Sequence, residues 1–290
     1  MCANSAGWGG IAIILIGALI ASPPCYASTF AEMNERNLEE AVCGLKEPIV
    51  FWFWSRAAGR PDPSRLAGLR NVEDISLTTK DGRTLRGYAL KARSFGNEQP
   101  SPKGYLLVAQ GNAMLADQIL SSFTEFANAG FDVYIFDYRG YGRSEGKRRL
   151  KAIVSDYSEI IEYLNSLQYP AHRFYAMSFG GIVVLNALNL KPGDHRVVID
   201  STPSRLSDYG CPEAYDPVRN LPEHGLNHLM IAGSKDHVVS PEQSKELLDE
   251  AQKRGASILR DPQLSHPFMD RNKSVHKGRM KAVMAFLLGE

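Results

Sequence analysis

A single serine stands where a short apolar strand pattern passes directly into a helical one. Residues 174–184 read Phe-Tyr-Ala-Met-Ser-Phe-Gly-Gly-Ile-Val-Val, with Ser178 at the change and the small residues Ala176 and Gly180 two places to either side. A strand that turns at once into a helix strains the backbone at the turn and brings the flanking segments so close that larger side chains would clash. Ser178 is therefore a candidate nucleophile, and an ordinary Ser-Gly turn is the alternative for this stretch alone.

The elements around Ser178 predict the sheet that would position it. Apolar strand patterns at residues 105–109, 133–136, 173–176, 197–199, 229–232 and 256–259 alternate with helical patterns at 113–128, 153–167, 180–190, 241–253 and 274–288. This alternation predicts a parallel sheet with helices on both faces. Residues 72–79 and 84–90 flank Asp81-Gly82, which predicts an antiparallel hairpin at one edge.

Chemistry in such a sheet gathers at the carboxyl ends of the strands. Ser178, Asp236 and His266 each come just after a strand, in that order along the chain. A serine hydroxyl needs a base to take its proton, and a carboxylate can orient that base. Asp200 also ends a strand and is a rival for the acid, unless it only caps the adjoining turn.

Two other histidines compete for the role of the base. His237 adjoins Asp236 and is poorly placed to bridge it to Ser178, and His276 opens the last helical pattern. His266 lies in a proline-flanked loop after the last strand, which makes it the preferred candidate.

Two further loops carry a resemblance. Gln-Gly-Asn-Ala (residues 110–113) comes after one strand, and Asp-Tyr-Arg-Gly-Tyr-Gly-Arg-Ser (residues 137–144) comes after the next. With the serine turn and the ordered Asp and His, the sequence resembles the α/β-hydrolase superfamily. It is most similar to small serine hydrolases that have H-G-N-A and D-Y-R-G-Y-G-x-S loops. Gln110 stands where that branch has histidine, and Ala176 stands where the G-x-S-x-G turn has glycine.

The resemblance covers residues from about 72 to the C-terminus and implies a specific site. It implies an α/β-hydrolase fold in which Ser178 is the nucleophile, His266 the base and Asp236 the acid. It places the oxyanion donors on the backbone N–H groups of Asn112 and Phe179.

The implied reaction is cleavage of a carboxylic ester, a thioester or an amide through an acyl-enzyme. The expected substrate is a small-molecule or lipid acyl compound. A non-catalytic binding protein of the same fold is one alternative, since Gln110 and Ala176 depart from the pattern. A membrane-anchored acyl (thio)esterase is the other alternative.

The balance of charged residues and the absence of metal and phosphate motifs limit the partners that we expect. The chain has 290 residues, with 33 Lys and Arg against 32 Asp and Glu, giving a net charge of +1. Binding to nucleic acid by counterion release needs concentrated positive charge, so we expect no nucleic-acid partner. The sequence contains no C-x-x-C, no H-E-x-x-H and no glycine-rich phosphate loop, so we expect no metal and no other cofactor.

The first 27 residues differ from the rest. Residues 8–21 are almost entirely apolar, Pro23 and Pro24 come next, and residues 25–27 offer small side chains for a signal peptidase. A run of about 14 residues is short for a membrane span and typical of an export signal. No Lys or Arg precedes it. We therefore expect export to the periplasm or the medium, with an uncleaved membrane anchor as the alternative.

Residues 28–70 are predicted to form an N-terminal helical and aromatic arm before a hydrolase domain at 71–290. We expect a short helix at 28–44 and an aromatic run at 49–54 that packs onto the domain, with a membrane or partner contact as the alternative. Removal of residues 1–27 leaves Cys43 and Cys211, which in an exported chain form a possible disulfide.

Two segments near the predicted site have simple interpretations. Residues 139–151 hold six Arg and Lys against one acid, Glu145. We interpret them as a solvated loop and helix start, with steering of an anionic substrate or contact with anionic lipid as the alternative. Residues 200–227 are a short segment in the place of a lid, and we expect turns and a small helix there.

Overall fold

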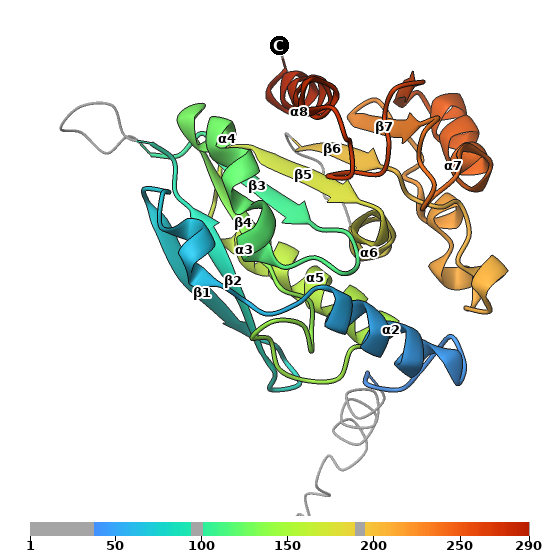
Figure 1. Ribbon diagram of the computed structural model, residues 1–290, viewed down its shortest axis with the longest axis horizontal. Coiled ribbons are helices and arrows are strands. Elements are labelled where there is room, and N and C mark those ends of the chain that lie inside the picture. The colour runs from blue at the N-terminus through green and yellow to red at the C-terminus, as the bar shows by residue number, and fades with distance from the viewer. Residues whose placement is uncertain (1–37, 94–100, 189–194, 290) are drawn as a thin grey trace, which may run out of the picture. The chain divides into compact units, whose positions relative to one another are not determined.

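The computed structural model describes residues 38–93, 101–188 and 195–289. These residues form an eight-stranded sheet in the order β1-β2-β4-β3-β5-β6-β7-β8 (Figure 1). The strands are β1 (Val72–Thr78), β2 (Thr84–Leu90), β3 (Gly104–Ala109), β4 (Phe131–Phe136), β5 (His172–Met177), β6 (His195–Asp200), β7 (His228–Gly233) and β8 (Ser257–Asp261).

The sheet is antiparallel only at its N-terminal edge. β1 pairs with β2, and β2 pairs with β4, in antiparallel register, whereas every pairing from β4 to β8 is parallel. The β1–β2 turn closes with a bond from Gly82 N–H to Thr79 O (2.8 Å). Gly82 has φ +78°, a conformation that glycine adopts without a steric cost. This arrangement confirms the mostly parallel sheet with an N-terminal hairpin.

Helices cover both faces of the sheet. One face carries α5 (Leu150–Ser166), α6 (Phe179–Ala187) and α7 (Pro241–Lys253), whose apolar side chains share one core cluster. The other face carries α3 (Ala116–Ile119), α4 (Thr124–Asn128) and α8 (Lys273–Leu288) over a second cluster. β3, β4 and β7 are buried along their whole length, as expected for strands covered on both faces.

Two predictions about helices need correction. The predicted helix at 113–128 is broken into α3, a 3₁₀ turn η2 (Leu120–Phe123) and α4. The predicted helix at 28–44 lies partly outside the described residues, and residues 38–44 form turns and bends. The helix of the arm is instead α2 (Lys46–Ala57), which contains the aromatic run.

The aromatic run is buried on one side only. Phe51 is buried, whereas Ile49, Val50, Trp52 and Phe53 are exposed. The expectation that the run packs onto the domain is therefore wrong for four of these side chains. A 3₁₀ turn, η1 (Pro63–Leu66), then leads toward β1.

The segment between β6 and β7 forms three 3₁₀ turns, η3 (Ser207–Tyr209), η4 (Glu213–Tyr215) and η5 (Pro217–Asn220). The buried Asp216 carboxylate holds it together by accepting bonds from the N–H groups of Leu206 and Ser207 and from the Ser207 hydroxyl. A disulfide joins Cys211 of this segment to Cys43, so the segment is linked covalently to the residues just before α2.

The predicted export signal or anchor at residues 1–27 lies outside the described residues. Within 38–93, 101–188 and 195–289, no helix has both the length and the hydropathy that a membrane span requires.

Candidate active site

Ser178 stands at the turn between β5 and α6. Its backbone has φ 54° and ψ −119°, a strained conformation for a residue with a side chain, at a cost of about 1–3 kcal/mol. Its N–H donates to Asp200 O (2.8 Å), and its carbonyl accepts from Thr202 Oγ1 (3.0 Å). The turn after β6 therefore holds the strained residue from both sides.

The two glycines after Ser178 allow α6 to approach its neighbours. A Cβ at Gly180 would lie 2.1 Å from Ala109 O at the end of β3, and one at Gly181 would lie 1.9 Å from Thr202 Oγ1. A Cβ at Gly111, in the loop after β3, would lie 3.7 Å from Ser178 Cβ. The 110–113 loop therefore lies against the serine turn, and no larger residue than glycine fits at 180 or 181.

Asp236 and His266 are brought together from the ends of β7 and β8. His266 Nδ1 lies 2.8 Å from Asp236 Oδ2, and Asp236 Oδ1 accepts the N–H groups of Val238 (2.8 Å) and Val239 (2.9 Å). Both side chains are buried. Burial raises the pKa of Asp236, but the bonds from His266 and the two backbone N–H groups outweigh it and lower the pKa. The carboxylate is therefore ionised and oriented toward the imidazole.

Asp200, the rival acid, lies in a different set of contacts. Its Oδ2 accepts from Tyr175 OH (2.9 Å) and lies 3.6 Å from Arg279 Nη1, and its Oδ1 accepts from Ser201 Oγ (3.1 Å). Burial raises the pKa of Asp200, against the opposing effects of Arg279, Tyr175 and Ser201. No bond to a histidine ring is described for Asp200, which supports Asp236 as the partner of the base.

Arg279 connects this network to the His266 loop. It donates to Ser265 O and lies 3.7 Å from Asp270 Oδ1, which in turn accepts Ser265 N–H (2.8 Å). Arg279 is buried on α8. Sequence reasoning missed it, since a lone arginine within a helical pattern is typical of a surface residue.

The other two candidate bases lie elsewhere. His237 is exposed. His276 is part-buried, with its Nδ1 4.0 Å from Asp270 Oδ2 and its ring against Phe268. Neither is described in contact with Asp236. Among the described residues no hydrogen bond joins Ser178 Oγ to the His266 ring, and such bonds often tighten only when substrate binds.

The predicted oxyanion donors lie on either side of the serine turn. Phe179 is the first residue of α6, where backbone N–H groups have no partner within the helix. Asn112 is in the loop that contacts Ser178, and its Oδ1 accepts from Tyr141 OH (2.5 Å) and from Ala113 N–H (3.2 Å). Tyr141, in the 137–144 loop, thus fixes the Asn112 side chain, a role that the sequence did not reveal.

Gln110, which replaces the histidine of the resembling branch, is fully buried. Its side-chain Nε2 donates to Phe136 O (2.9 Å), and its backbone carbonyl accepts from Tyr138 OH (2.5 Å). Gln110 therefore connects the loop after β3 to the end of β4. Ala176 is likewise buried, in register with Ala109 on β3 and Ile199 on β6.

Known proteins share both the sequence pattern and the fold. The family of serine aminopeptidases (S33) matches residues 100–208. The esterase Pf2001 of Pyrococcus furiosus aligns with a TM-score of 0.61 at 16% identity, covering 79% of this chain and 95% of that one. The lidless α/β serine hydrolase XC6422 of Xanthomonas campestris aligns with a TM-score of 0.56 at 19% identity, covering 74% and 94%.

The chain has the α/β-hydrolase fold.

Relatives by sequence include one protein from Escherichia coli and one from Schizosaccharomyces pombe. The uncharacterized protein YfhR of Escherichia coli is 25% identical over 230 residues, covering 72% of this chain and 79% of its own length. The protein bem46 of Schizosaccharomyces pombe is 29% identical over 196 residues, covering 59% and 62%. The family match and the esterase neighbours together support a hydrolase with the α/β fold.

The N-terminal arm of the chain reaches the serine turn. The ring of Phe51 on α2 lies edge-on to the ring of Phe179, with centroids 5.4 Å apart, and Tyr138 contacts Phe179 in the same way at 5.3 Å. Residues 38–57 therefore contribute to the surroundings of the candidate site.

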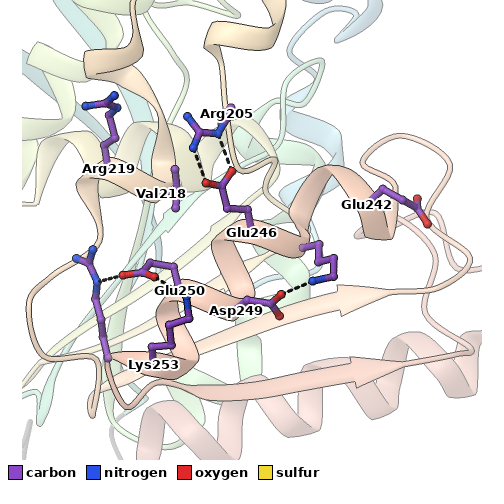
Figure 2. Close-up of a pocket in the computed structure, with 10 residues that line it drawn as sticks. Arg205, Val218, Arg219, Glu242, Glu246, Asp249, Glu250 and Lys253 are labelled. Atoms are coloured by element: carbon purple, nitrogen blue, oxygen red, sulfur yellow. Dashed lines mark hydrogen bonds and ion pairs between the residues drawn. The ribbon is translucent and has the colours of Figure 1, made fainter.

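A charged groove of about 570 Å³ along α7 does not belong to this site. Figure 2 shows that several of its charged side chains pair with one another, as Arg205 does with Glu246, whereas Arg219 and Glu242 have no partner among the residues drawn. Lys245 likewise pairs with Asp249. Ser178, Asp236 and His266 are not among its lining residues.

Proposed function

We propose that this protein is a serine hydrolase that cleaves a carboxylic ester or thioester through an acyl-enzyme. The observation that carries the proposal is the buried Asp236–His266 pair, with 2.8 Å between Oδ2 and Nδ1, at the same sheet edge as the strained Ser178. A carboxylate on Nδ1 leaves Nε2 of the imidazole as the proton acceptor.

In the proposed first half-reaction, Ser178 Oγ attacks the substrate carbonyl carbon as its proton moves to His266 Nε2. Asp236 stabilises the imidazolium that forms. The N–H groups of Asn112 and Phe179 donate to the oxyanion, and losing one such donor costs about 10²–10³ in rate. The imidazolium then protonates the leaving oxygen or sulfur as its bond to carbon breaks.

The second half-reaction repeats these steps with water. His266 takes a proton from water, which attacks the acyl carbon, and the Ser178 oxygen leaves with the proton returned by His266. The free acid is the product, and the enzyme is regenerated.

The two departures from the family pattern fit this mechanism. Gln110 and Ala176 are both buried and packed in the scaffold beneath the serine turn. The rival function, a non-catalytic binding protein of the same fold, rested on these residues alone.

The proposal is tested by hydrolysis of soluble p-nitrophenyl esters. The full chain is expected to hydrolyse them, and Ser178→Ala is expected to reduce kcat to background while the circular dichroism spectrum and Tm are kept. Equal activity of the two proteins would reject Ser178 as the nucleophile. A folded wild type inactive on esters and thioesters of every acyl length would favour the binding protein.

A further inference from the structure

Helix α2 has two apolar faces, of which only one is used by the fold. Its inward face carries Phe51 and, just past its end, Ala58, and both are buried. Its outward face carries Leu45, Ile49, Trp52 and Phe53, which are 92%, 68%, 52% and 59% exposed. These four have the i, i+4, i+7, i+8 spacing of a single helical face. The helix therefore presents a row of large apolar side chains to the outside.

The acidic residue of α2 points into the protein, and its basic residues point outward. Its one acidic residue, Glu47, is buried and accepts the N–H groups of Cys43 (2.7 Å) and Leu150 (2.9 Å). Its two cations, Lys46 and Arg56, are exposed, and Arg56 lies over the Trp52 ring at 5.5 Å. The outward face is thus both apolar and positively charged.

The basic segment of residues 139–151 lies beside this face. Arg148 Nη1 donates to Ser55 Oγ (2.6 Å) on α2, and Leu150 N–H donates to Glu47. Lys147, Arg149 and Lys151 lie in the same short stretch, and of these Lys147 is exposed. Arg148 is therefore the cation of this segment whose side chain contacts α2, and the Lys147 ammonium lies 3.9 Å from Glu39 Oε2. We define the docking face as residues 45, 46, 49, 52, 53 and 56 of the arm with Lys147 and Arg148 of the basic segment.

The first described residues lie against the same basic segment. Glu39, two residues after residue 37, accepts Lys147 N–H (2.9 Å). The apolar run at residues 8–21 ends 17 positions before Leu38. A segment with the composition of an export signal or an anchor is therefore connected to the edge of the docking face.

Helix α2, which carries the docking face, also contacts the candidate site through its other face. Phe51, on the other side of the same helix, contacts Phe179, the residue after Ser178. In Figure 1, α2 lies below α6, the helix that begins directly after Ser178.

We propose that the docking face binds the surface of a lipid bilayer with anionic headgroups, so that Ser178 receives acyl chains of lipid esters from the bilayer. Exposed Trp and Phe with flanking Lys and Arg match the chemistry of the membrane interface, where apolar side chains enter the acyl boundary and cations meet anionic lipid. The binding surface stands independently, whereas the substrate class rests on the proposed serine hydrolase.

The surface is tested with the full chain carrying Ser178→Ala, so that the result does not depend on turnover, and Trp8→Phe, so that only Trp52 and Trp54 emit. Vesicles of phosphatidylcholine and phosphatidylglycerol are prepared with and without bromine on the acyl chains. Bromine quenches tryptophan only at short range. We expect quenching by the brominated vesicles, weakened several-fold by Ile49→Ser/Phe53→Ser.

A matched control changes apolar residues at the opposite edge of the sheet. Leu167 and Leu226 are exposed and precede the amino ends of β5 and β7. Leu167→Ser/Leu226→Ser is therefore expected to leave quenching unchanged. Lys147→Ser/Arg148→Ser is expected to reduce binding to anionic vesicles and to leave the weak binding to pure phosphatidylcholine as it is.

Two results would overturn the proposal. One is a protein that sediments with vesicles while Trp52 and Trp54 remain unquenched, which would mean that residues 1–37 bind the lipid and the docking face does not. The other is a shift in emission that depends on protein concentration without lipid, which would assign the face to a second copy of the chain.

The substrate class has a separate readout in the active protein. Ile49→Ser/Phe53→Ser is expected to lower hydrolysis of lipid esters in vesicles several-fold and to leave kcat/KM for a soluble short-chain ester unchanged. Equal loss on both substrates would contradict delivery of substrate from a bilayer. Absence of any hydrolysis by the wild type would reject the proposed function and leave the quenching result intact.

Discussion

His266 Nδ1 lies 2.8 Å from Asp236 Oδ2, and two backbone N–H groups hold the other oxygen of that carboxylate. Three fixed bonds to one buried side chain leave it a single orientation. The imidazole is thereby set in the tautomer that a general base at Nε2 requires.

Asp236→Asn is expected to lower kcat by about 10⁴-fold, since an amide does not hold the required tautomer or stabilise the imidazolium. The measurement is steady-state hydrolysis of a soluble ester, with Tm as the check on folding. Asp200→Asn is the matched comparison because Asp200 also ends a strand and is buried. An equal loss of kcat in a folded Asp200→Asn protein would reassign the acid.

Arg279→Met is expected to destabilise the protein by about 3–5 kcal/mol, because it leaves Asp200 and Asp270 buried without their cation. Denaturant unfolding measures the change. Arg260→Met is the control: Arg260 forms an ion pair with Asp249 (2.6 Å) in which both side chains are exposed, and such pairs contribute less than about 1 kcal/mol. Similar losses in the two variants would show that the buried network adds no stability of its own.

Asp137 gives the stability a defined pH dependence. Burial raises its pKa to about 6, against the opposing bond from Ala116 N–H. The ionised carboxylate is therefore disfavoured in the folded state. The contribution of Asp137 to the unfolding free energy falls as pH rises from about 4 to above 6. Relative to wild type, Asp137→Asn is expected to gain unfolding free energy over this window, by up to about 3 kcal/mol at 1.36 kcal/mol per pH unit. A difference that is constant with pH would contradict this assignment.

The Cys43–Cys211 disulfide closes a loop with a sequence separation of 168. Its removal by Cys43→Ser/Cys211→Ser is expected to cost about 2–5 kcal/mol. A non-reducing digest is expected to yield the linked Cys43 and Cys211 peptides. Alkylation of both thiols in the native protein, or an unfolding midpoint that is unchanged by reductant, would argue against the bond.

Local signals in the sequence predicted much of the fold. β2 and α7 have the predicted bounds, because Asp81-Gly82 sets the hairpin and Pro241 opens α7 inside the capping box formed by Ser240 and Gln243. The turn at Ser178 was equally predictable, since strand, small residues and helix adjoin one another. The position of Asp236 and His266 at the carboxyl ends of two strands marked them as partners, and the structure places them in contact.

Other features depend on tertiary contacts that the sequence does not display. α2 was not predicted as a helix because both of its faces are apolar and its one acid, Glu47, points inward, so the usual amphipathic period is missing. The residues at 113–128 keep an apolar period, although the backbone breaks it into two short helices. The pairing of Arg279 with Asp200 joins positions 79 residues apart, and no local pattern marks it.

The most direct test of the serine hydrolase is covalent labelling of the full chain with a fluorophosphonate probe, followed by mass spectrometry of the modified peptide. We predict one adduct, on the peptide that contains Ser178, and no adduct in Ser178→Ala or after unfolding. A folded wild type that takes no label, or takes it on another residue, would contradict a nucleophilic Ser178.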